Sequence, residues 1–364
     1  MPRFLAIDVG AGTLDALYVD TATGDQFKFV GKSPTRVLAE RIAACERDRI
    51  LITGRQMGGG PVAEAIRIKA GEARVMMTRS AAETIHHHLG RIKKSGVHLV
   101  SQGTARLEAG KRNVAWFKTG DVRPELIGAT LNSMGIEAAV DFLGVAVQDH
   151  GTPKKGISSL DFRHQIFREI IERSPRPSAF LFEAREIPPF LRRMHAAAKD
   201  SSRIRARRTY LMDTGMAAVL GASKDPLALG KANVIVLDVA TSHTLGALLV
   251  EEEIMGFFEY HTRDLSPEIL KSLIVDLAEG RLSHERVVSG GGHGAYVRGG
   301  VGFDRVELIV ATGPKRGVVD RMGLDRMVLG APFGDNMMTG TTGLIAAMAE
   351  REGVSPVISR LMPR

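Results

Sequence analysis

The chain repeats one arrangement of strands and loops at two distant positions. Residues 4–20 and 234–250 each contain an apolar strand that ends in an aspartate, a loop of small residues, a Thr-Leu pair and a second apolar strand. A turn follows each segment, and third strands are expected at 26–30 and 254–259. A repeat of this size is typical of a duplicated structural unit, so the sequence predicts two related lobes.

A second correspondence follows in the same order. Residues 49–54 and 307–313 each read as a strand that ends in Thr-Gly, followed by basic residues and a helix. The resulting order of elements predicts two α/β lobes, with extra strands and helices at 78–208. The segments 213–221 and 340–347 are rich in small residues. We expect them to be helices that cross between the lobes; the alternative is that they are simply well-packed helices.

The loop after each repeated aspartate has the chemistry of a phosphate site. Gly10 and Gly12 permit backbone conformations closed to other residues and let main-chain N–H groups approach an anion, while Thr13 adds a hydroxyl donor. Asp8 repels a bare phosphate but can hold a magnesium ion that bridges to it, and Asp238 occupies the matching strand end in the other lobe. Two such loops predict a polyphosphate that is gripped from both sides.

Two other nucleotide-binding motifs fit less well. A dinucleotide-binding fold needs a helix after its glycines, whereas residues 13–20 alternate as a strand does. A P-loop needs Lys followed by Ser or Thr, and the three consecutive glycines at 58–60 lack this pair. The sequence therefore favours paired hairpin loops.

The hairpin loops and the two small-residue segments resemble the phosphate and connecting motifs of the superfamily that contains actin, sugar kinases and heat-shock chaperone ATPases. A closer resemblance, which covers nearly the whole chain, is to an uncharacterised family of that superfamily that carries the label pyruvate-formate-lyase activating protein. This closer resemblance rests on short segments at 58–61, 147–151, 258–262, 292–295 and 312–316.

The resemblance implies an α/β fold of two duplicated RNase-H-like lobes, as in actin-like ATPases, with a nucleotide cleft between them. We place the first lobe, with insertions, at 1–205 and the second, whose C-terminal helix returns to the hinge, at 206–364. The resemblance also implies ATP in the cleft, magnesium at Asp8 and Asp238, and adenosine near 312–316. The residues expected to contact the nucleotide are Gly10, Ala11, Gly12, Thr13, Thr241, Ser242, Thr244, Thr312, Gly313, Lys315 and Arg316.

Two positions depart from the superfamily pattern. Gly313 is followed by Pro314 where paired glycines are usual, and Ala240 stands in the second phosphate loop where glycine is usual. An alanine can present its N–H in such a loop only if its φ angle stays negative. These departures keep a second interpretation open, in which the chain is a nucleotide sensor or scaffold that binds ATP without significant turnover.

Candidate catalytic residues lie in loops around the predicted cleft. Gln148 and Asp149 end a strand of the first lobe, where related ATPases orient the attacking water or a substrate hydroxyl, and His243 lies in the loop expected to face the γ-phosphate. Three interpretations compete for the loop histidines. They converge on a transition metal, or His243 orients water or accepts a proton, or all of them hydrogen-bond loop carbonyls. The loop histidines are His150, His243, His261 and His293.

The single cysteine, Cys45, limits the chemistry of this chain. A radical activating enzyme needs closely spaced cysteines for its iron–sulfur cluster, so the family label is not supported. The same count excludes a cluster-bearing activating ATPase, unless a partner contributes the thiolates. The N-terminus reaches Asp8 too soon for a signal peptide, and no segment approaches the roughly 20 uncharged residues that cross a bilayer. We therefore expect a cytoplasmic protein without a membrane partner.

The formal charge of +8 raises the question of a nucleic-acid partner. The densest basic run has no aromatic side chain interleaved with it for stacking on bases, so we expect a solvated basic surface and not a nucleic-acid site. The expected partners are a nucleotide and, as a further candidate, a protein client. The sequence thus predicts a Mg-ATP-dependent ATPase or phosphotransferase without identifying its substrate. The basic run comprises Arg192, Arg193, Arg203, Arg205, Arg207 and Arg208.

Overall fold

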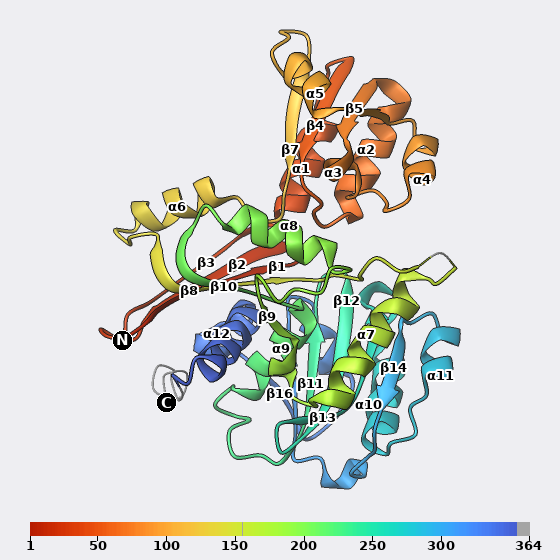
Figure 1. The fold of residues 1–364 in the computed structure, drawn as a ribbon. Coiled ribbons are helices and arrows are strands. Elements are labelled where there is room, and N and C mark those ends of the chain that lie inside the picture. Colours follow the sequence, from red (N-terminus) through yellow and green to blue (C-terminus); the bar gives the residue numbers. More distant parts are fainter. Residues whose placement is uncertain (155, 355–364) are drawn as a thin grey trace.

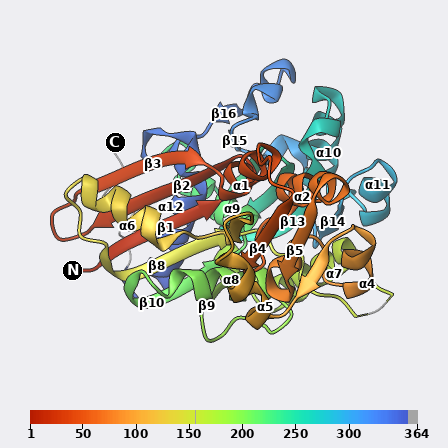
Figure 2. The ribbon, with the colours of Figure 1, turned by 90° about the horizontal axis from the view of Figure 1, so that it is seen from above.

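The computed structural model describes residues 1–154 and 156–354 and contains two six-stranded sheets (Figures 1 and 2). Five strands of each sheet share one order, and the sixth strand lies at opposite edges, β9 in the first sheet and β14 in the second. In each sheet a three-stranded antiparallel meander is followed by parallel strands on the far side of the first strand. The first sheet runs in the order β3 (Gln26–Lys32), β2 (Thr13–Asp20), β1 (Arg3–Val9), β8 (Ala139–Val147), β10 (Arg205–Met212) and β9 (Leu181–Glu183). The second runs β14 (Gly294–Val297), β13 (Glu253–His261), β12 (His243–Val250), β11 (Asn233–Val239), β15 (Leu308–Thr312) and β16 (Met327–Leu329).

The shared order confirms the predicted duplication but corrects one correspondence. The strand parallel to β11 is β15, and its equivalent beside β1 is β8. We had matched β15 with residues 49–54, which form β4 in a separate sheet. The error has a physical cause: both strands are apolar and end in Thr-Gly, but the choice of neighbouring strand depends on long-range pairing that a local sequence does not encode.

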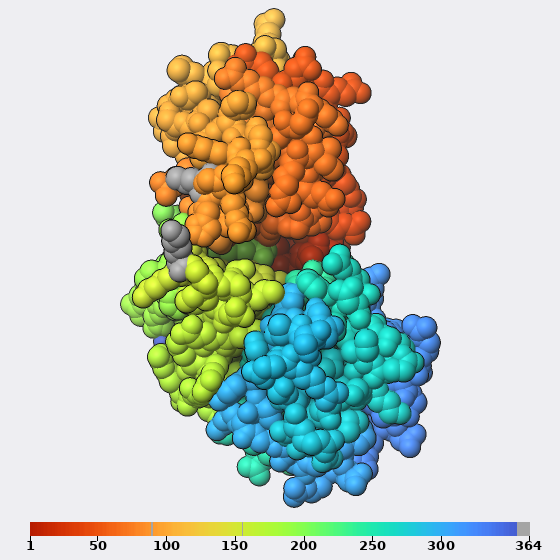
Figure 3. Space-filling view, turned by 90° about the vertical axis from the view of Figure 1, so that its right-hand side faces the viewer, coloured from red at the N-terminus to blue at the C-terminus, as the bar shows by residue number. Residues whose placement is uncertain are grey.

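A third sheet belongs to an insertion between β3 and β8. Its four strands are all parallel, in the order β6 (His98–Val100), β5 (Arg74–Thr78), β4 (Arg49–Gly54) and β7 (Ala115–Thr119). The insertion stands apart from the two large sheets at the top of Figure 1, and a waist separates it from them in Figure 3. Its helices are α1 (Pro34–Ala43), α2 (Gly60–Glu72), α3 (Arg79–Ala82), α4 (Leu89–Lys94) and α5 (Gln102–Ala109), and α6 (Pro124–Ser133) leads back to β8.

Helices cover both faces of the large sheets, which explains why the central strands are continuous apolar runs. On the first sheet, α12 (Thr339–Arg351) packs on β1 and β8, and α8 (Arg192–Ser201) packs against β8 and β10. On the second sheet, α9 (Thr214–Ser223) packs on β11 and β15, and α10 (Pro267–Ala278) packs on β12 and β13. The remaining helices are α7 (Ser159–Arg173), α11 (His284–Ser289) and short 3-10 helices at Pro177–Phe180, Thr262–Asp264, Phe303–Arg305, Arg316–Arg321, Pro332–Gly334 and Asn336–Met338.

The two small-residue segments form α9 and α12, and these helices cross each other as predicted. A Cβ atom on Gly221 would lie 1.8 Å from the carbonyl oxygen of Thr339, and one on Gly343 would lie 1.8 Å from that of Ala217. The backbones therefore touch because both contact positions are glycine. One apolar core runs through this crossing and joins side chains of both sheets, such as Phe4 and Val236.

Strand pairing passes from the first sheet to the second after β10, which ends at Met212. The boundary between the two lobes that the sequence predicts, at 205/206, stays a prediction. Cys45 is half-buried against the core of the insertion. Across residues 1–154 and 156–354, no helix is both long and apolar enough to cross a membrane.

Candidate active site

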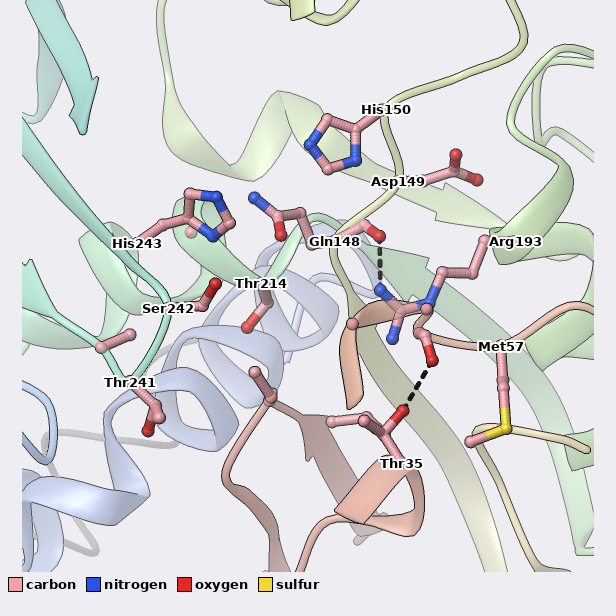
Figure 4. Close-up of a pocket in the computed structure, with 18 of the residues that line it drawn as sticks. Thr35, Met57, Gln148, Asp149, His150, Arg193, Thr214, Thr241, Ser242 and His243 are labelled. Atoms are coloured by element: carbon pink, nitrogen blue, oxygen red, sulfur yellow. Dashed lines mark hydrogen bonds between the residues drawn. The ribbon is translucent and has the colours of Figure 1, made fainter. Parts of the chain in front are cut away.

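A cavity of about 730 Å³ lies where the two large sheets and the insertion meet. The ends of β1, β8 and β11 open into it, together with the first turns of α9 and α12. The insertion contributes residues 56–61 and 83–88. Figure 4 shows side chains from these different elements facing one another across this space. The predicted cleft therefore exists, and the insertion forms one of its walls.

The two predicted phosphate loops have the same internal geometry. The N–H of Gly10 donates to the carbonyl of Thr13 at 3.0 Å, and the N–H of Ala240 donates to the carbonyl of His243 at 3.1 Å. Ala240 does not have a positive φ angle, so the alanine fits its loop without backbone strain. Each loop is a tight hairpin that ends beside the aspartate of the preceding strand.

One of the two reasons predicted for the glycines of the first loop is wrong, namely the need for unusual backbone angles. Neither Gly10 nor Gly12 lies in the left-handed region, so unusual backbone angles do not explain them. A Cβ atom on Gly12 would instead lie 2.6 Å from the hydroxyl oxygen of Thr241 in the opposite loop. Glycine at position 12 thus allows the loops of the two lobes to touch.

Three carboxylates share the space between these loops. Burial raises the pKa of Asp8 to about 6, while its Oδ1 accepts a hydrogen bond of 2.6 Å from the Thr214 hydroxyl. Burial and the charge of Asp8 raise the pKa of Asp15 to about 8 and that of Asp238 to about 7. The buried Oδ1 of Asp15 accepts no hydrogen bond. Asp8 and Asp15 lie opposite each other on β1 and β2, and the charge of Asp8 acts on both Asp15 and Asp238. Carboxylate oxygens of this kind are the ligands that a hard divalent cation prefers.

Helix α12 contributes to the position of Asp8 in this cluster. A Cβ atom on Gly340 would lie 2.0 Å from Oδ2 of Asp8. The first turn of the C-terminal helix therefore closes directly over the end of β1 because residue 340 has no side chain. The sequence already singled out this small-residue segment, although only for its role in helix crossing.

A buried ion network lies deeper in the cavity, and the sequence did not reveal it. Arg163 of α7 pairs with Asp213 at 2.7 Å and with Glu259 of β13 at 3.0 Å, and all three side chains are buried. Asp213 also accepts the N–H groups of Gly215 and Met216 and so caps α9. The local sequence gives one indication of this network, the charged residue Glu259 within an apolar strand. Its arginine partner is distant in sequence, so only the fold identifies the pair.

Gln148 and Asp149 both lie at the cavity, but they are used differently. The Gln148 amide donates to Oε1 of Glu259 at 2.7 Å, which links the first lobe to the second. The two carboxylate oxygens of Asp149 accept main-chain N–H groups of Gly151 at 2.9 Å and Met194 at 3.0 Å. Figure 4 shows the Asp149 carboxylate directed away from Gln148 and His243. The Asp149 carboxylate is therefore already engaged by main-chain N–H groups, whereas the Gln148 side chain faces the space between the lobes.

The predicted nucleotide contacts separate into two groups. The cavity is lined by Gly10, Ala11, Gly12, Thr13, Thr241, Ser242 and Gly313, but Thr244, Thr312, Lys315 and Arg316 lie outside its lining. Thr244 bonds to the Thr262 hydroxyl at 3.0 Å, because strand alternation turns it away from the side of His243 and Leu245. Thr312 is buried, with its hydroxyl oxygen 2.5 Å from that of Thr339.

Three of the four loop histidines come together at the ends of neighbouring strands. The rings of His243, His261 and His293 have centroids 4.3–5.0 Å apart. Burial lowers the pKa of His243 to about 4 and also lowers that of His293. Burial likewise lowers the pKa of His150 to about 3, and this ring lies beside the same cavity. His150 and His243 are therefore neutral at physiological pH.

Two sheets with the same order of five strands, joined by crossing helices around a cleft, define a two-lobed actin-like ATPase fold. A family model described as "Putative pyruvate format-lyase activating enzyme (DUF1786)" matches residues 57–318, which is most of the chain. The chain belongs to that family.

Several solved structures resemble this fold at low identity. An inorganic polyphosphate/ATP-glucomannokinase from Arthrobacter sp. strain KM is 12% identical, with a TM-score of 0.36, over 96% of this chain and 100% of the other. A reductive activator for a corrinoid, iron-sulfur protein is 11% identical with a TM-score of 0.40; the match covers 97% of this chain but only 62% of that one.

A ROK family glucokinase from Streptomyces griseus, in complex with glucose and AMPPNP, is 10% identical with a TM-score of 0.36, over 96% of this chain and 100% of the other. These likenesses concern the fold alone. No curated protein matches the chain in sequence.

Proposed function

We propose that the cleft binds Mg-ATP and that the chain is an ATPase or an ATP-dependent phosphotransferase. The observation that carries this proposal is the set of three carboxylates, Asp8, Asp15 and Asp238, held between two hairpin loops of small residues. Two facing hairpins can surround a polyphosphate, and the clustered carboxylates supply the oxygen ligands that Mg²⁺ prefers. The strand-end aspartate and its hairpin loop occur in both lobes, whereas Asp15 has no counterpart because Leu245 stands opposite Asp238.

The residues divide into roles by their position. Asp8 and Asp238 would hold magnesium, with Asp15 beside them, and the loops at Gly10–Thr13 and Ala240–His243 would contact the phosphates. When bound, magnesium neutralises negative charge on the phosphates. Thr214 fixes the orientation of Asp8 through its hydroxyl.

Gln148 and His243 are the residues we assign to a water or hydroxyl nucleophile. Both line the cavity, so each side chain can help to orient a water or hydroxyl there. Gln148 is held by Glu259 with its amide between the lobes. We assign Asp149 a positioning role instead, because both of its oxygens bind main-chain N–H groups.

Adenosine is best accommodated beside Gly313 and Pro314, which line the cavity next to Asn336 and Met337. The amide of Asn336 donates to the carbonyl of Gly313 at 3.2 Å and so ties the loop to the start of α12. Lys315 and Arg316 lie outside the lining, and the guanidinium of Arg316 bonds the carbonyl of Gly330. We therefore propose a nucleoside pocket made of backbone and apolar side chains without these two cations.

A nucleotide sensor remains the second candidate, and one observation favours it. The loops of the two lobes approach each other closely at Gly12 and Thr241, so a movement of one lobe against the other changes the space between the two phosphate loops. A protein that opens to bind ATP and closes around it can signal through that movement without turnover. Both candidates use the same cleft and differ only in whether phosphate is released.

The deciding experiment combines calorimetric titration of Mg-ATP with a phosphate-release assay on the same sample. We expect magnesium-dependent binding, and Asp238→Asn should lower any turnover at least about 100-fold, because it removes one electrostatic element of the site. Asp25→Asn, at an exposed turn of the first lobe, is the matched control and should change neither quantity. Absence of binding at millimolar Mg-ATP would refute the proposal, and binding without turnover would select the sensor.

A further inference from the structure

The three clustered histidines occupy adjacent strand ends in the second lobe. His243 begins β12 and lies directly opposite His261, which ends β13. His293 immediately precedes β14, the next strand in the sheet, and its N–H donates to the carbonyl of Glu259 at 2.8 Å. The pairing of three neighbouring strands therefore fixes the backbone positions of all three rings.

The ring nitrogens are arranged as ligands of one ion. One nitrogen from each ring can be chosen so that all three lie within 4.8 Å of one another. The Nε2 atoms of His261 and His293 are 3.0 Å apart, with the ring planes at 87°. Two nitrogens bound to the same tetrahedral zinc ion at the usual bond length lie about 3.3 Å apart, so this pair needs only a small adjustment.

Glu259 provides an independent observation that points to a ligand. The Nδ1 atom of His293, on the far side of the ring from His261, is buried without a hydrogen-bond partner and lies 3.8 Å from Oε1 of Glu259. Histidines that bind a metal normally direct their second nitrogen to a carboxylate or carbonyl, which orients the ring. Glu259 is itself fixed by Arg163 and Gln148, so it is a rigid support for such an orientation.

We propose that His243, His261 and His293 form a binding site for a divalent transition-metal ion of the Zn²⁺ type. Three imidazole ligands leave a fourth coordination position open for water or for an oxygen of a bound molecule. His243 also lines the cavity, so the ion lies at the edge of the cleft. The site is distinct from the carboxylates Asp8 and Asp238, because imidazole favours transition metals whereas carboxylates favour magnesium.

The test uses the full chain without an affinity tag, stripped of metal with a chelator and dialysed. Zn²⁺ is titrated by calorimetry, and Co²⁺ is titrated by visible absorption, whose intensity separates tetrahedral from octahedral coordination. We expect one tightly bound ion per chain and a tetrahedral Co²⁺ spectrum. His261→Asn and His293→Asn should each weaken binding at least about 10-fold, as loss of one group of a metal site commonly does.

A second histidine cluster provides the matched control. His86 and His88 have ring centroids 5.2 Å apart in the connection between α3 and α4, on the side of the cavity formed by the insertion, and could bind added metal there. The double variant His86→Asn/His88→Asn should retain the tight site. If the tight site disappears in this variant but survives in His261→Asn and His293→Asn, the proposal is wrong.

Folding and nucleotide binding are checked separately. Melting temperatures in chelator should agree between wild type and the two single variants, while the increase on adding Zn²⁺ should be smaller in these two variants than in wild type. If a variant does not fold, the Co²⁺ spectrum of the wild-type protein still tests the proposal. An octahedral spectrum, or no spectrum of bound Co²⁺, would show that the proposed histidine site is wrong. Mg-ATP titration of metal-stripped wild type distinguishes failure of this site from failure of the proposed nucleotide site.

Discussion

At the scale of single residues, the cleft holds carboxylates whose pKa values have been raised by burial. Folded-state pKa values of about 6 for Asp8, about 7 for Asp238 and about 8 for Asp15 exceed the ordinary value of 3.8. Between the ordinary pKa of 3.8 and the raised pKa of each carboxyl group, the folded chain binds more protons than the unfolded chain. The stability contributed by these protonated groups is complete below the unfolded pKa and is lost as the pH rises through the folded pKa.

We therefore predict that the metal-free protein becomes less stable between pH 6.5 and 8. The buried histidines oppose this trend only at its lower end, because the stability that their lowered pKa values confer is lost as the pH falls through the unfolded value of 6.5 and is nearly complete by about pH 7.5. Each proton released contributes a slope of up to about 1.4 kcal/mol per pH unit. Unfolding followed in chelator at several pH values measures the trend.

Asp15→Asn is the diagnostic variant for this prediction. It removes the carboxylate with the highest raised pKa, so its stability should depend less on pH over the same interval. A wild-type protein whose stability is constant or rises from pH 6.5 to 8 would contradict the assignment of raised pKa values to this cluster.

At the scale of elements, the chain is held together where α9 and α12 cross. Gly221 and Gly343 each face a backbone carbonyl so closely that even a methyl group has no room. Because the obstructing atoms are backbone atoms of a packed helix, they cannot rotate away as a side chain would. The crossing therefore depends on glycine at these two positions.

Gly343→Ala should destabilise the protein by about 1–3 kcal/mol or more, the range for overpacking a tight interior. Gly128→Ala is the matched control, since Gly128 is in the middle of α6 and a Cβ there meets no atom within 4 Å. That variant should be more stable by about 0.5–1 kcal/mol, because alanine favours a helix. Urea unfolding of both variants makes the comparison, and equal effects would show that helix propensity, not the crossing, decides the outcome.

The crossing also shows what local sequence can and cannot predict. The repeated Asp-ended strands, the hairpin loops and the small-residue helices are encoded within short segments, and each was predicted from the sequence. The place of β8 beside β1 and the pairing of Arg163 with Glu259 depend on contacts between distant segments. The histidines were recognised as loop residues, but only the pairing of β12 with β13 and β14 brings three of them together.

At the scale of the whole molecule, the net positive charge is spread over a surface where many cations already have partners. Within the basic run, Arg192 pairs with Glu83, Arg193 with Asp121, Arg203 with Glu125 and Arg208 with Glu352. Arg205 and Arg207 are exposed at the beginning of β10. A run that looks strongly basic in the sequence is therefore largely neutralised by the fold.

We accordingly predict that the protein does not bind DNA or RNA tightly. Arg205→Glu and Arg207→Glu should leave the melting temperature and Mg-ATP binding unchanged, because both side chains are exposed and far from the carboxylate cluster in the sheet.

Arg193→Glu is the contrasting variant: it breaks the 2.8 Å pair with a buried Asp121 and should destabilise the protein by roughly 3–5 kcal/mol. Titration of wild type with DNA and RNA at several salt concentrations measures the binding. A nucleic-acid site would release counterions from several phosphates and lose affinity steeply as salt rises, so tight binding with such a slope would contradict the prediction.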